Sequence, residues 1–375
     1  MLHYQTIMQK VLEKILACKS VSVVGLAKNT GKTETLNYIL QRLIGSGKTI
    51  AVTSIGLDGE QIDQIFGTKK PEITIYKNMI FNTVEKFFDK KTFDAEILKI
   101  SGLNTPLGRV VTAKANETGK IILSGAAHTE TLKIIIAQNA DLGADITIVD
   151  GATSRLSLAS PAVTDALILA TGAALSANIE QLVKKTKFVC SLIDVEQKTK
   201  NKEQRHETPV ISSDSEFFLT ERDKSTLTNE ISSFGRNDYK LQTVNYKLNE
   251  TTNLELPSSL MISKISTDNL EKIRQNKNLF ALGIVGDNLL DFLRLNVDLQ
   301  DFMLVANDFT KLFVSPFAYN NFIKKGGKIN VLHRTKLLAV TINPTSPTGI
   351  LLNSDILRAE LQKNINAPVF DVRKI

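Results

Sequence analysis

Apolar side chains along this chain alternate between helical spacing and short continuous runs. Ile7, Val11 and Ile15 lie about one helical turn apart and predict an amphipathic helix near the start of the chain. A valine-rich run over residues 20–24 follows and predicts a buried strand. Helical spacing returns over residues 36–44 and ends at a pair of glycines, which is typical of a helix C-terminus. The chain therefore opens as helix, strand, loop and helix.

Short strand-like runs continue at similar intervals through the rest of the chain. In the first half they cover residues 49–55, 73–76, 97–100, 109–113, 121–124, 146–150 and 166–170. In the second half they cover residues 280–285, 302–305, 328–332, 337–342 and 369–372, and a capped helix is predicted to begin at Ser354. Strands that alternate with helices predict the α/β fold class, with a parallel sheet flanked by helices.

The chain is long enough for two domains. Its 375 residues are 42% hydrophobic, and a chain of this length usually divides into more than one core. Residues 196–209 have no apolar periodicity, so we predict a solvated linker there. The first predicted domain therefore covers residues 1–195. The second, also α/β, covers residues 210–375 and is expected to bind a partner or a substrate.

Composition argues against several kinds of protein. The formal net charge is +7, but the basic residues are scattered among acidic ones, so no nucleic-acid partner is expected. Cys18 and Cys190 are far apart and fit a reducing compartment without a disulfide framework or a thiolate zinc site. No uncharged apolar stretch reaches about eighteen residues, and the N-terminus does not resemble a secretion signal. We therefore expect a cytoplasmic protein without membrane contact.

Residues 25–33, Gly-Leu-Ala-Lys-Asn-Thr-Gly-Lys-Thr, join the first predicted strand to the second predicted helix. A glycine-containing loop that ends in Gly-Lys-Thr in this context is typical of a phosphate-binding loop, or P-loop, although a glycine turn can also serve packing. The N–H groups of the loop and the positive end of the helix dipole would face the phosphates, and Gly31 would let the backbone approach them. Lys32 is predicted to contact the β and γ phosphates and to act in catalysis.

The residue after this lysine predicts a metal site. Thr33 is expected to place its hydroxyl on Mg²⁺, which bridges the phosphates and neutralises their charge. The predicted nucleotide-binding residues are Gly25, Lys28, Asn29, Thr30, Gly31, Lys32, Thr33 and Glu34. No NKxD-like segment that would read the base is evident, so the sequence does not distinguish ATP from GTP. The expected cofactors are ATP or GTP together with Mg²⁺.

Two aspartates follow predicted strands and are candidates for the same site. The C-terminal ends of neighbouring parallel strands face one crevice, so Asp58 is a candidate Mg²⁺ ligand or water-positioning catalytic residue. Its Asp-Gly sequence is also a common turn. Asp150 ends the run Ile-Thr-Ile-Val-Asp, which is typical of a Walker B strand whose carboxylate holds Mg²⁺ through water. The predicted metal-binding residues are Thr33, Asp58 and Asp150.

Other polar residues follow predicted strands without a specific pattern. Arg155 could approach a γ-phosphate or lie on the surface, and His128 could line the crevice. No histidine has a partner at ligand spacing, so a histidine-based metal site is not expected. Residues 343–347, Asn-Pro-Thr-Ser-Pro, end a strand of the predicted second domain, and Asp287 and Asp308 also follow apolar runs. A second ligand or partner surface and simple turn chemistry explain these three equally well.

The loop differs from the usual P-loop in one respect. Five residues separate Gly25 from Gly31, where the usual motif has four, so Leu26 occupies the standard position of the first glycine. This longer spacing resembles the loop of dethiobiotin synthetases, within the P-loop proteins that include ParA-like and nitrogenase-iron-protein-like ATPases. By that resemblance Lys28 could match the additional loop lysine of those ATPases, although its offset from Lys32 differs. Otherwise Lys28 is a solvated loop lysine.

Four segments together resemble one family over most of the chain. They are GLAKNTGKT from Gly25, TSIGLDGE from Thr53, IVDGATSRLSLASPAVTDALILATGAA from Ile148 and VTINPTSPTG from Val340. They are similar to the smaller ATPase subunit of the lysine 5,6-aminomutase reactivase. The resemblance implies a larger MutS-like partner subunit and an adenosylcobalamin-dependent aminomutase as the client. It also implies that ATP drives the release of damaged cobalamin, in the setting of lysine fermentation.

Two other functions fit the same nucleotide motif. An ATP-dependent ligase or kinase resembling dethiobiotin synthetase would close its second domain over a small carboxylate-bearing substrate. A GTP-binding metallochaperone is the other alternative. A reactivase should hydrolyse ATP slowly and depend on a protein partner, whereas a ligase should turn over with a small molecule alone. The sequence therefore predicts a nucleoside triphosphate hydrolase and leaves its client open.

Overall fold

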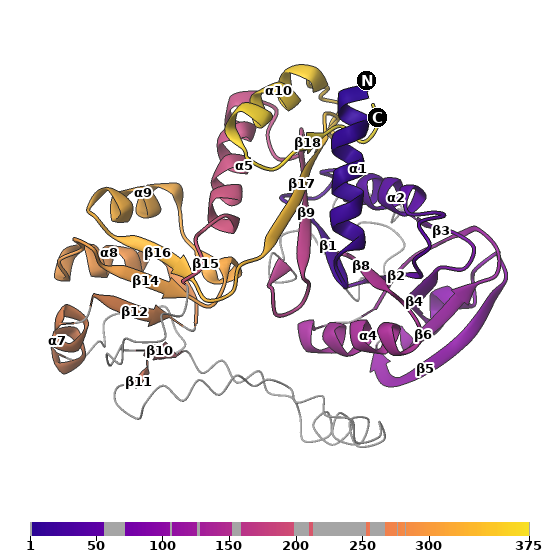
Figure 1. Ribbon diagram of the computed structural model, residues 1–375, viewed down its shortest axis with the longest axis horizontal. Coiled ribbons are helices and arrows are strands. Elements are labelled where there is room, and N and C mark those ends of the chain that lie inside the picture. Colours follow the sequence, from indigo (N-terminus) through magenta and orange to yellow (C-terminus); the bar gives the residue numbers. More distant parts are fainter. Residues whose placement is uncertain are drawn as a thin grey trace. The chain divides into compact units, whose positions relative to one another are not determined.

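Strand β1 (Ser20–Gly25), the valine-rich run of the sequence, lies inside a nine-stranded sheet (Figure 1). All of its residues are buried, as expected of a strand covered on both faces. The strands pair in the order β18-β17-β9-β1-β8-β2-β4-β6-β5. The bounds of the others are β2 (Ile50–Ser54), β4 (Ile80–Val84), β5 (Ala95–Thr105), β6 (Gly108–Ala115), β8 (Ile146–Asp150), β9 (Ala166–Gly172), β17 (Lys336–Asn343) and β18 (Val369–Phe370).

The computed structural model describes residues 2–55, 72–105, 107–125, 128–151, 159–198, 210–212, 253–255, 267–275, 277–281 and 283–374. The chain divides into two compact units. Unit 1 consists of residues 1–193 and 335–375 and contains the nine-stranded sheet, and unit 2 consists of residues 194–334. The α/β fold class predicted from the sequence is confirmed.

Helices cover both faces of the unit 1 sheet (Figure 1). Helices α1 (Leu2–Leu16) and α2 (Lys32–Arg42) pack into the core on one face, and α4 (Thr129–Asp141) packs into the core on the other. Ile148 and Val149 are neighbours on β8 but belong to these two separate cores. This follows because successive side chains of a strand point to opposite faces of the sheet.

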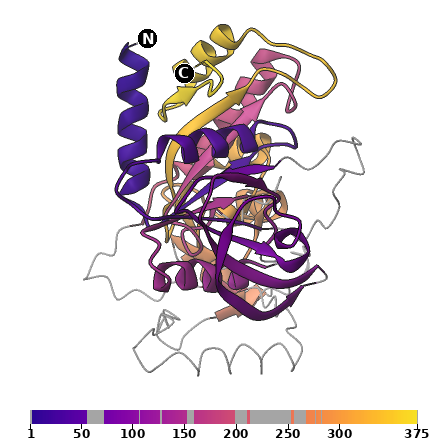
Figure 2. The same cartoon turned by 90° about the vertical axis from the view of Figure 1, so that its right-hand side faces the viewer.

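The two ends of the chain belong to unit 1 and lie side by side. In both views the start of α1 is close to the segment that follows β18 (Figure 1, Figure 2). Helices α5 (Ile179–Ile193) and α10 (Ser354–Asn364) pack against each other in the same unit, and α3 (Glu85–Phe88) is a single turn. Within the described ranges, no helix is both long enough and apolar enough to span a bilayer.

One edge of the unit 1 sheet is antiparallel, which the sequence did not predict. Strands β18 to β4 run parallel to one another, whereas β6 pairs antiparallel with both β4 and β5. The β5–β6 turn contains Gly108 with a φ of 101°, a left-handed conformation that favours glycine. A separate antiparallel ribbon joins β3 (Ile73–Ile75) to β7 (Gly119–Ile121). Apolar runs predict strands but do not report the direction of pairing.

A buried amide pair fixes α4 to this edge. Asn82 of β4 and Asn139 of α4 are fully buried, and each donates to the side-chain oxygen of the other, at 3.1 and 2.9 Å. The Asn82 amide also donates to the hydroxyl of Thr112 on β6 at 2.8 Å. Buried polar groups cost free energy unless they are paired, so this arrangement favours one placement of α4 against β4.

Unit 2 is built on a five-stranded parallel sheet in the order β11-β10-β12-β14-β16. Its strands are β10 (Val210–Ser212), β11 (Asn253–Glu255), β12 (Asn278–Ala281), β14 (Met303–Ala306) and β16 (Lys328–Val331). A short parallel pair is formed by β13 (Val285–Gly286) and β15 (Leu312–Phe313). Among the described residues of this unit, the helices are α7 (Thr267–Gln275), α8 (Asp287–Asn296) and α9 (Pro316–Lys324), with a 3-10 turn η3 (Phe309–Lys311).

Two segments of unit 2 differ from the prediction. Residues 280–285 are not one strand but are divided between β12 and β13. Glu196 and Lys198, in the predicted linker, pair with the edge strand β16. The Val331 N–H donates to the Glu196 carbonyl at 3.0 Å, and the Lys198 N–H donates to the Val331 carbonyl at 2.9 Å. Polar residues are common at sheet edges, so this pairing leaves no apolar signal. Residues 199–209 of the predicted linker lie outside the described residues.

Residues 335–375 do not follow the predicted division of the chain. The sequence analysis assigned them to a second domain at 210–375, but β17, α10 and β18 complete unit 1. Strand β17 pairs in parallel with β9, from Lys336 opposite Ala166 to Asn343 opposite Gly172. Pairing between strands this far apart in sequence has no local signature, so periodicity could not reveal it.

Candidate functional site

The glycine-rich loop between β1 and α2 covers residues 26–31. Helix α2 begins at Lys32, and its N-cap Gly31 has a φ of 89° and a ψ of 20°. Asn29 also has a positive φ, 61°. Glycine and asparagine tolerate this left-handed conformation, so the Asn-Thr-Gly sequence forms the turn that leads into the helix. Gly31 has no side chain that would compete with a ligand for the first N–H groups of α2.

The loop folds tightly over its first glycine. A Cβ atom at Gly25 would lie 2.5 Å from Thr30 Oγ1 and 2.9 Å from the Cγ and Cδ atoms of Lys32. Thr30 is buried, and its hydroxyl donates to the Ala27 carbonyl at 2.9 Å. A larger residue at position 25 would have to displace Thr30 or the Lys32 side chain. Packing within the loop therefore requires glycine at this position.

Lys32 contacts the segment that follows β8. Its ammonium donates a hydrogen bond to the Gly151 carbonyl oxygen at 2.7 Å. Gly151 is held in turn by β1, because its N–H donates to the Val23 carbonyl at 3.0 Å. Gly151 directly follows Asp150, the partly exposed aspartate predicted to hold Mg²⁺. The loop lysine is therefore bonded to the residue next to that carboxylate.

The loop and Asp150 lie at the carboxyl ends of adjacent parallel strands. In the strand register, Asp150 of β8 lies opposite Val23 of β1 on one side and Ser54 of β2 on the other. Across β1, Gly25 lies opposite Ala170 of β9. Ligands of open α/β sheets bind in the crevice outside such strand ends. The topology therefore brings four strand ends to the edge where the sequence predicted a nucleotide.

Asn343, from near the end of the chain, fixes the loop from a second direction. It is the last residue of β17, and its side-chain amide donates to the Asn29 carbonyl at 3.1 Å. A Cβ atom at Gly31 would lie 2.9 Å from Asn343 Cβ, so loop and side chain are in close contact. The Asn343 carbonyl accepts a hydrogen bond from Ala173 N–H at 2.9 Å, which holds it beside β9. The sequence analysis noted Asn343 as a strand exit in the predicted second domain and within the segment quoted from Val340, but did not connect it with the loop.

Two further contacts join α2 to the C-terminal segment. The buried hydroxyls of Thr35 and Thr341 are hydrogen-bonded at 2.8 Å. The Arg373 guanidinium donates to Glu34 Oε1 at 2.8 Å, in an exposed ion pair of the kind that adds little stability. Glu34, predicted as a nucleotide-binding residue, therefore has a partner within the chain. Thr341 lies in the segment quoted from Val340 but was given no role, and no motif marked Arg373, so sequence reasoning missed both contacts.

The residues at this edge fit a nucleotide with magnesium. The N-terminus of α2 carries partial positive charge and Lys32 carries a full one, and both would favour phosphate oxygens. Thr33 and Asp150 offer a hydroxyl and a carboxylate, and Mg²⁺ commonly takes one or two such groups together with water and phosphate oxygens. The described part of the chain gathers no group of three or more His, Cys, Asp and Glu residues that could hold a metal.

Some of the other unit 1 residues that were predicted for the nucleotide site lie in the described part of the chain, and others do not. Asp58 and Arg155 lie outside the described residues. Lys28 and Asn29 are exposed on the loop. His128 occupies the N-cap position of α4, with an extended backbone.

The two aspartates singled out in unit 2 make turn and capping contacts. Asp287 Oδ1 accepts a hydrogen bond from the Ser315 N–H at 2.6 Å. Asp308 caps η3, where its Oδ1 accepts from the Thr310 N–H at 2.9 Å. Side chains of this type commonly satisfy backbone N–H groups where a helical turn begins. Turn chemistry accounts for these two contacts.

Thr53 has a buried hydroxyl at the end of β2. The residue is fully buried beside Ser54, and its Oγ1 has no hydrogen-bond partner among the described residues. Gly125 packs closely here, because a Cβ atom on it would lie 2.4 Å from the Ser54 carbonyl oxygen and 3.3 Å from Thr53 Oγ1. An unpaired buried hydroxyl costs free energy. The sequence analysis quoted Thr53 only as the start of the segment TSIGLDGE and gave it no role, because the sequence does not show that β2 lies beside β8.

Comparison with known proteins found no relative of this chain. No protein-family model, no curated protein and no solved structure matches the chain. The features that define the candidate site are the turn at residues 26–31, the Lys32–Gly151 hydrogen bond and the Asn343–Asn29 hydrogen bond.

Proposed function

We propose that this chain is a Mg²⁺-dependent P-loop nucleoside triphosphatase, and the family resemblance favours ATP over GTP as its nucleotide. The observation that supports it most is the hydrogen bond from the Lys32 ammonium to the Gly151 carbonyl. It holds a cation between the N-terminus of α2 and the strand that ends in Asp150. A phosphate oxygen would replace this carbonyl as the acceptor, since hydrogen bonds between charged partners are about twice as strong as neutral ones.

The groups at this edge have separate roles in the proposed reaction. The N–H groups of the loop and of the first turn of α2 bind the phosphates. Lys32 stabilises negative charge on the β and γ phosphates as the γ-phosphoryl group is transferred to water. The Thr33 hydroxyl and the Asp150 carboxylate are the groups that would hold Mg²⁺, which would neutralise charge on the phosphates. Asp58 remains the candidate for positioning the attacking water.

The family resemblance supports a proposal about the client. The ATPase would act with a larger MutS-like subunit to exchange damaged cobalamin on an adenosylcobalamin-dependent aminomutase. Such a role requires that the ATP-bound and ADP-bound states differ in affinity for the client, since a ligand shifts an equilibrium only by its differential affinity. The two alternatives are the dethiobiotin synthetase-like ligase and the GTP-binding metallochaperone. Both would use the same nucleotide site as the reactivase, but they differ from it in the molecule that turnover requires.

Thermal melting with and without MgATP tests nucleotide binding. At a hundredfold excess over Kd, a ligand that binds only the folded state adds about 2.7 kcal/mol to stability. The melting temperature of the wild type should rise, and that of Lys32→Ala should not. Lys86→Ala removes an exposed lysine of α3 and should melt like the wild type in both conditions. An equal shift in Lys32→Ala would contradict the proposed site.

The molecule that the chain needs for ATP hydrolysis distinguishes between the possible clients. ATP hydrolysis is measured with the purified chain, then with small carboxylates, then with the larger subunit and the mutase. Hydrolysis that rises only with the protein partners supports the reactivase. Turnover with a small carboxylate alone supports the ligase, and a preference for GTP together with metal delivery supports the metallochaperone. Either of the last two outcomes overturns the reactivase proposal but keeps the nucleotide site.

A further inference from the structure

The contacts of the proposed nucleotide site give a bound nucleotide a direction along the sheet edge. Lys32, which would contact the β and γ phosphates, donates to the Gly151 carbonyl at 2.7 Å, just beyond β8. Strand β8 lies on one side of β1, and β9 and β17 lie on the other. The first turn of α2 contacts β17, because the hydroxyls of Thr35 and Thr341 are hydrogen-bonded at 2.8 Å. A nucleotide with its terminal phosphates at β8 would therefore place its nucleoside end beside β17.

A short hairpin follows β17 at this position and covers residues 344–352. The Leu352 N–H donates to the Pro344 carbonyl at 2.9 Å, and the Ser346 N–H donates to the Ile350 carbonyl at 2.9 Å. The Ile350 N–H donates in return to the Ser346 hydroxyl oxygen at 3.1 Å. These bonds hold the backbone of the hairpin from within, so its shape does not depend on a ligand.

One side chain joins this hairpin to the glycine-rich loop. The Asn343 amide donates to the Asn29 carbonyl at 3.1 Å, and Asn343 Oδ1 accepts from the Thr345 N–H at 3.2 Å. The same amide group is therefore bonded to the loop through its nitrogen and to the hairpin through its oxygen. The hairpin thus begins directly beside the loop proposed to bind phosphate.

The hairpin exposes two adjacent large apolar side chains. Ile350 is 39% exposed and Leu351 is 74% exposed. Scattered exposed apolar residues are normal on a protein surface, but these two share an ordered turn beside the proposed site. Among the described residues of unit 1, the other large apolar side chains that are at least as exposed lie outside the loops that follow the parallel strands. They are Ile44, Ile97, Ile100 and Ile356.

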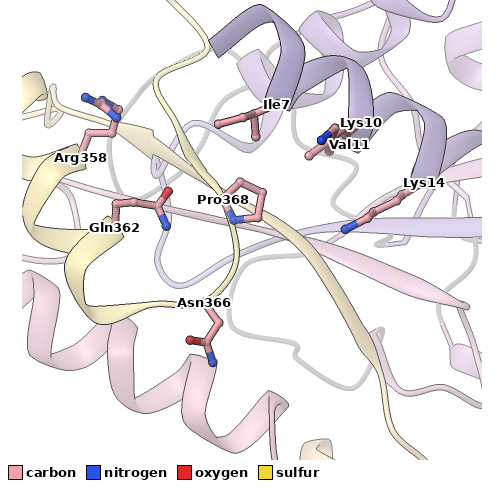
Figure 3. A pocket seen from close by; sticks show the side chains of 8 residues that line it. All are labelled: Ile7, Lys10, Val11, Lys14, Arg358, Gln362, Asn366 and Pro368. Carbon is pink, nitrogen blue, oxygen red and sulfur yellow. The ribbon is translucent and has the colours of Figure 1, made fainter. Parts of the chain in front are cut away.

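A hollow of about 450 Å³ between α1 and α10 is not at this edge of the sheet (Figure 3). Pro368 lines the hollow and directly precedes β18, which runs parallel to β17. The hollow therefore lies toward the amino ends of these strands, whereas the nucleotide is proposed at their carboxyl ends. A base held beside β17 would meet the hairpin and not this hollow.

We propose that the hairpin at residues 344–352 is the base subsite of this chain, where Ile350 and Leu351 pack against one face of the purine ring. The proposal rests on the nucleotide site proposed at Lys32 and assigns residues to the other end of the same ligand. The faces of a purine ring are flat and apolar, so contact with aliphatic side chains removes apolar surface of both from water. Ligand sites are commonly lined in this way, with a few polar groups that fix orientation.

Calorimetric titration of the full chain with MgATP and with magnesium tripolyphosphate separates the two ends of the ligand. Tripolyphosphate carries the phosphates without a base, so it should bind through the loop alone. Ile350→Gln/Leu351→Gln should lower the affinity for MgATP at least about tenfold and leave that for tripolyphosphate unchanged. Ile97→Gln/Ile100→Gln removes two exposed isoleucines of β5 and should bind both ligands like the wild type.

The outcomes distinguish failure of the base subsite from failure of the nucleotide site. Wild-type affinity for MgATP in the hairpin variant overturns the base subsite alone. Equal loss of MgATP and tripolyphosphate in that variant would show that the hairpin acts by shaping the loop, and it would also overturn the subsite. So would an equal loss of MgATP affinity in the β5 variant. Failure of the wild type to bind either ligand contradicts the nucleotide site itself, and the base subsite with it.

Discussion

The side-chain amide of Asn343 donates a hydrogen bond to the Asn29 carbonyl at 3.1 Å, across a separation of 314 residues. It joins the end of β17 to the loop that precedes α2. Gly31 packs against the same side chain, with 2.9 Å between the position of an added Cβ atom and Asn343 Cβ. The conformation of the proposed phosphate-binding loop therefore depends on the C-terminal part of the chain.

Asn343→Ala should weaken nucleotide binding more than its effect on stability explains. Loss of one hydrogen bond of this kind costs about 1 kcal/mol of folding free energy. Asn353→Ala is the matched control, because Asn353 caps α10 by accepting from the N–H groups of Asp355 and Ile356 at 3.1 Å. Its loss also costs about 1 kcal/mol but leaves the loop untouched. Equal affinity for MgATP in the two variants, at equal stability, would contradict the role given to Asn343.

Asp150→Asn should remove the dependence of nucleotide binding on Mg²⁺. The amide keeps the shape of the carboxylate but has no negative charge for the cation. ATP affinity without Mg²⁺ should stay near the wild-type value, and the gain on adding Mg²⁺ should be lost. Asp145→Asn, at the other end of β8, removes a carboxylate that accepts from the Thr49 N–H at 2.8 Å. That control should keep the full magnesium effect. A wild-type magnesium effect in Asp150→Asn would exclude the carboxylate from the site.

Gly25→Ala should disrupt the loop while α2 and the sheet stay folded. The new methyl group would meet Thr30 Oγ1 at 2.5 Å and the Lys32 side chain at 2.9 Å. Overpacking of this kind costs about 1–3 kcal/mol, and here it displaces the side chain proposed to bind phosphate. We expect affinity for MgATP to fall at least about tenfold. Circular dichroism verifies the fold, and wild-type affinity in a folded Gly25→Ala variant would show that the loop geometry is not needed.

The ion pair between Glu85 and Arg109 should give part of the stability a defined pH dependence. The Arg109 guanidinium donates to Glu85 Oε1 at 2.7 and 2.9 Å, and the Arg109 N–H donates to Oε2 at 2.8 Å. These side-chain bonds, followed by the backbone bond, lower the pKa of Glu85 from its usual 4.5. A lowered pKa in the folded state contributes stability above the unfolded pKa, and this contribution is lost as the pH falls through the folded value.

Urea unfolding across this range measures the effect. The wild type should be more stable than Glu85→Gln near neutral pH, and the difference should shrink as the pH falls below 4.5. The effect should be small because the pair is exposed. Glu96→Gln removes a charge from β5 without touching Arg109 and should not show this convergence. A difference between wild type and Glu85→Gln that is constant into acid would contradict the assignment.

The local sequence pattern was enough to predict those helices and strands whose own apolar residues show which side is buried. The valine-rich run at residues 20–24 became β1, and the helical spacing at residues 36–44 matched most of α2. Periodicity reports which side chains are buried but not which strand lies beside them. The return of β17 to β9 and the antiparallel pairing of β6 were therefore missed.

The candidate site also contains residues that a local pattern predicts and residues that it does not. Residues 25–33 form one continuous motif, so their loop and helix could be predicted from sequence. Asp150 could be predicted as a candidate because it ends an apolar strand that follows such a motif in the chain. Asn343 and Arg373 contact the same loop and helix from the far end of the chain, and no local rule identifies them. Asp58 stays a prediction, because it lies outside the described residues.

Equilibrium titration with a fluorescent ATP analogue and Mg²⁺ tests the central claim most directly. The wild type should bind one molecule per chain in a saturable manner, and unlabelled ATP should displace it. Lys32→Ala should lose this binding, because it removes the cation that the structure holds against the Gly151 carbonyl at 2.7 Å. Lys86→Ala should retain it. Absence of saturable binding to the wild type, or equal binding to Lys32→Ala, would contradict the proposal that residues 25–33 form a phosphate-binding loop.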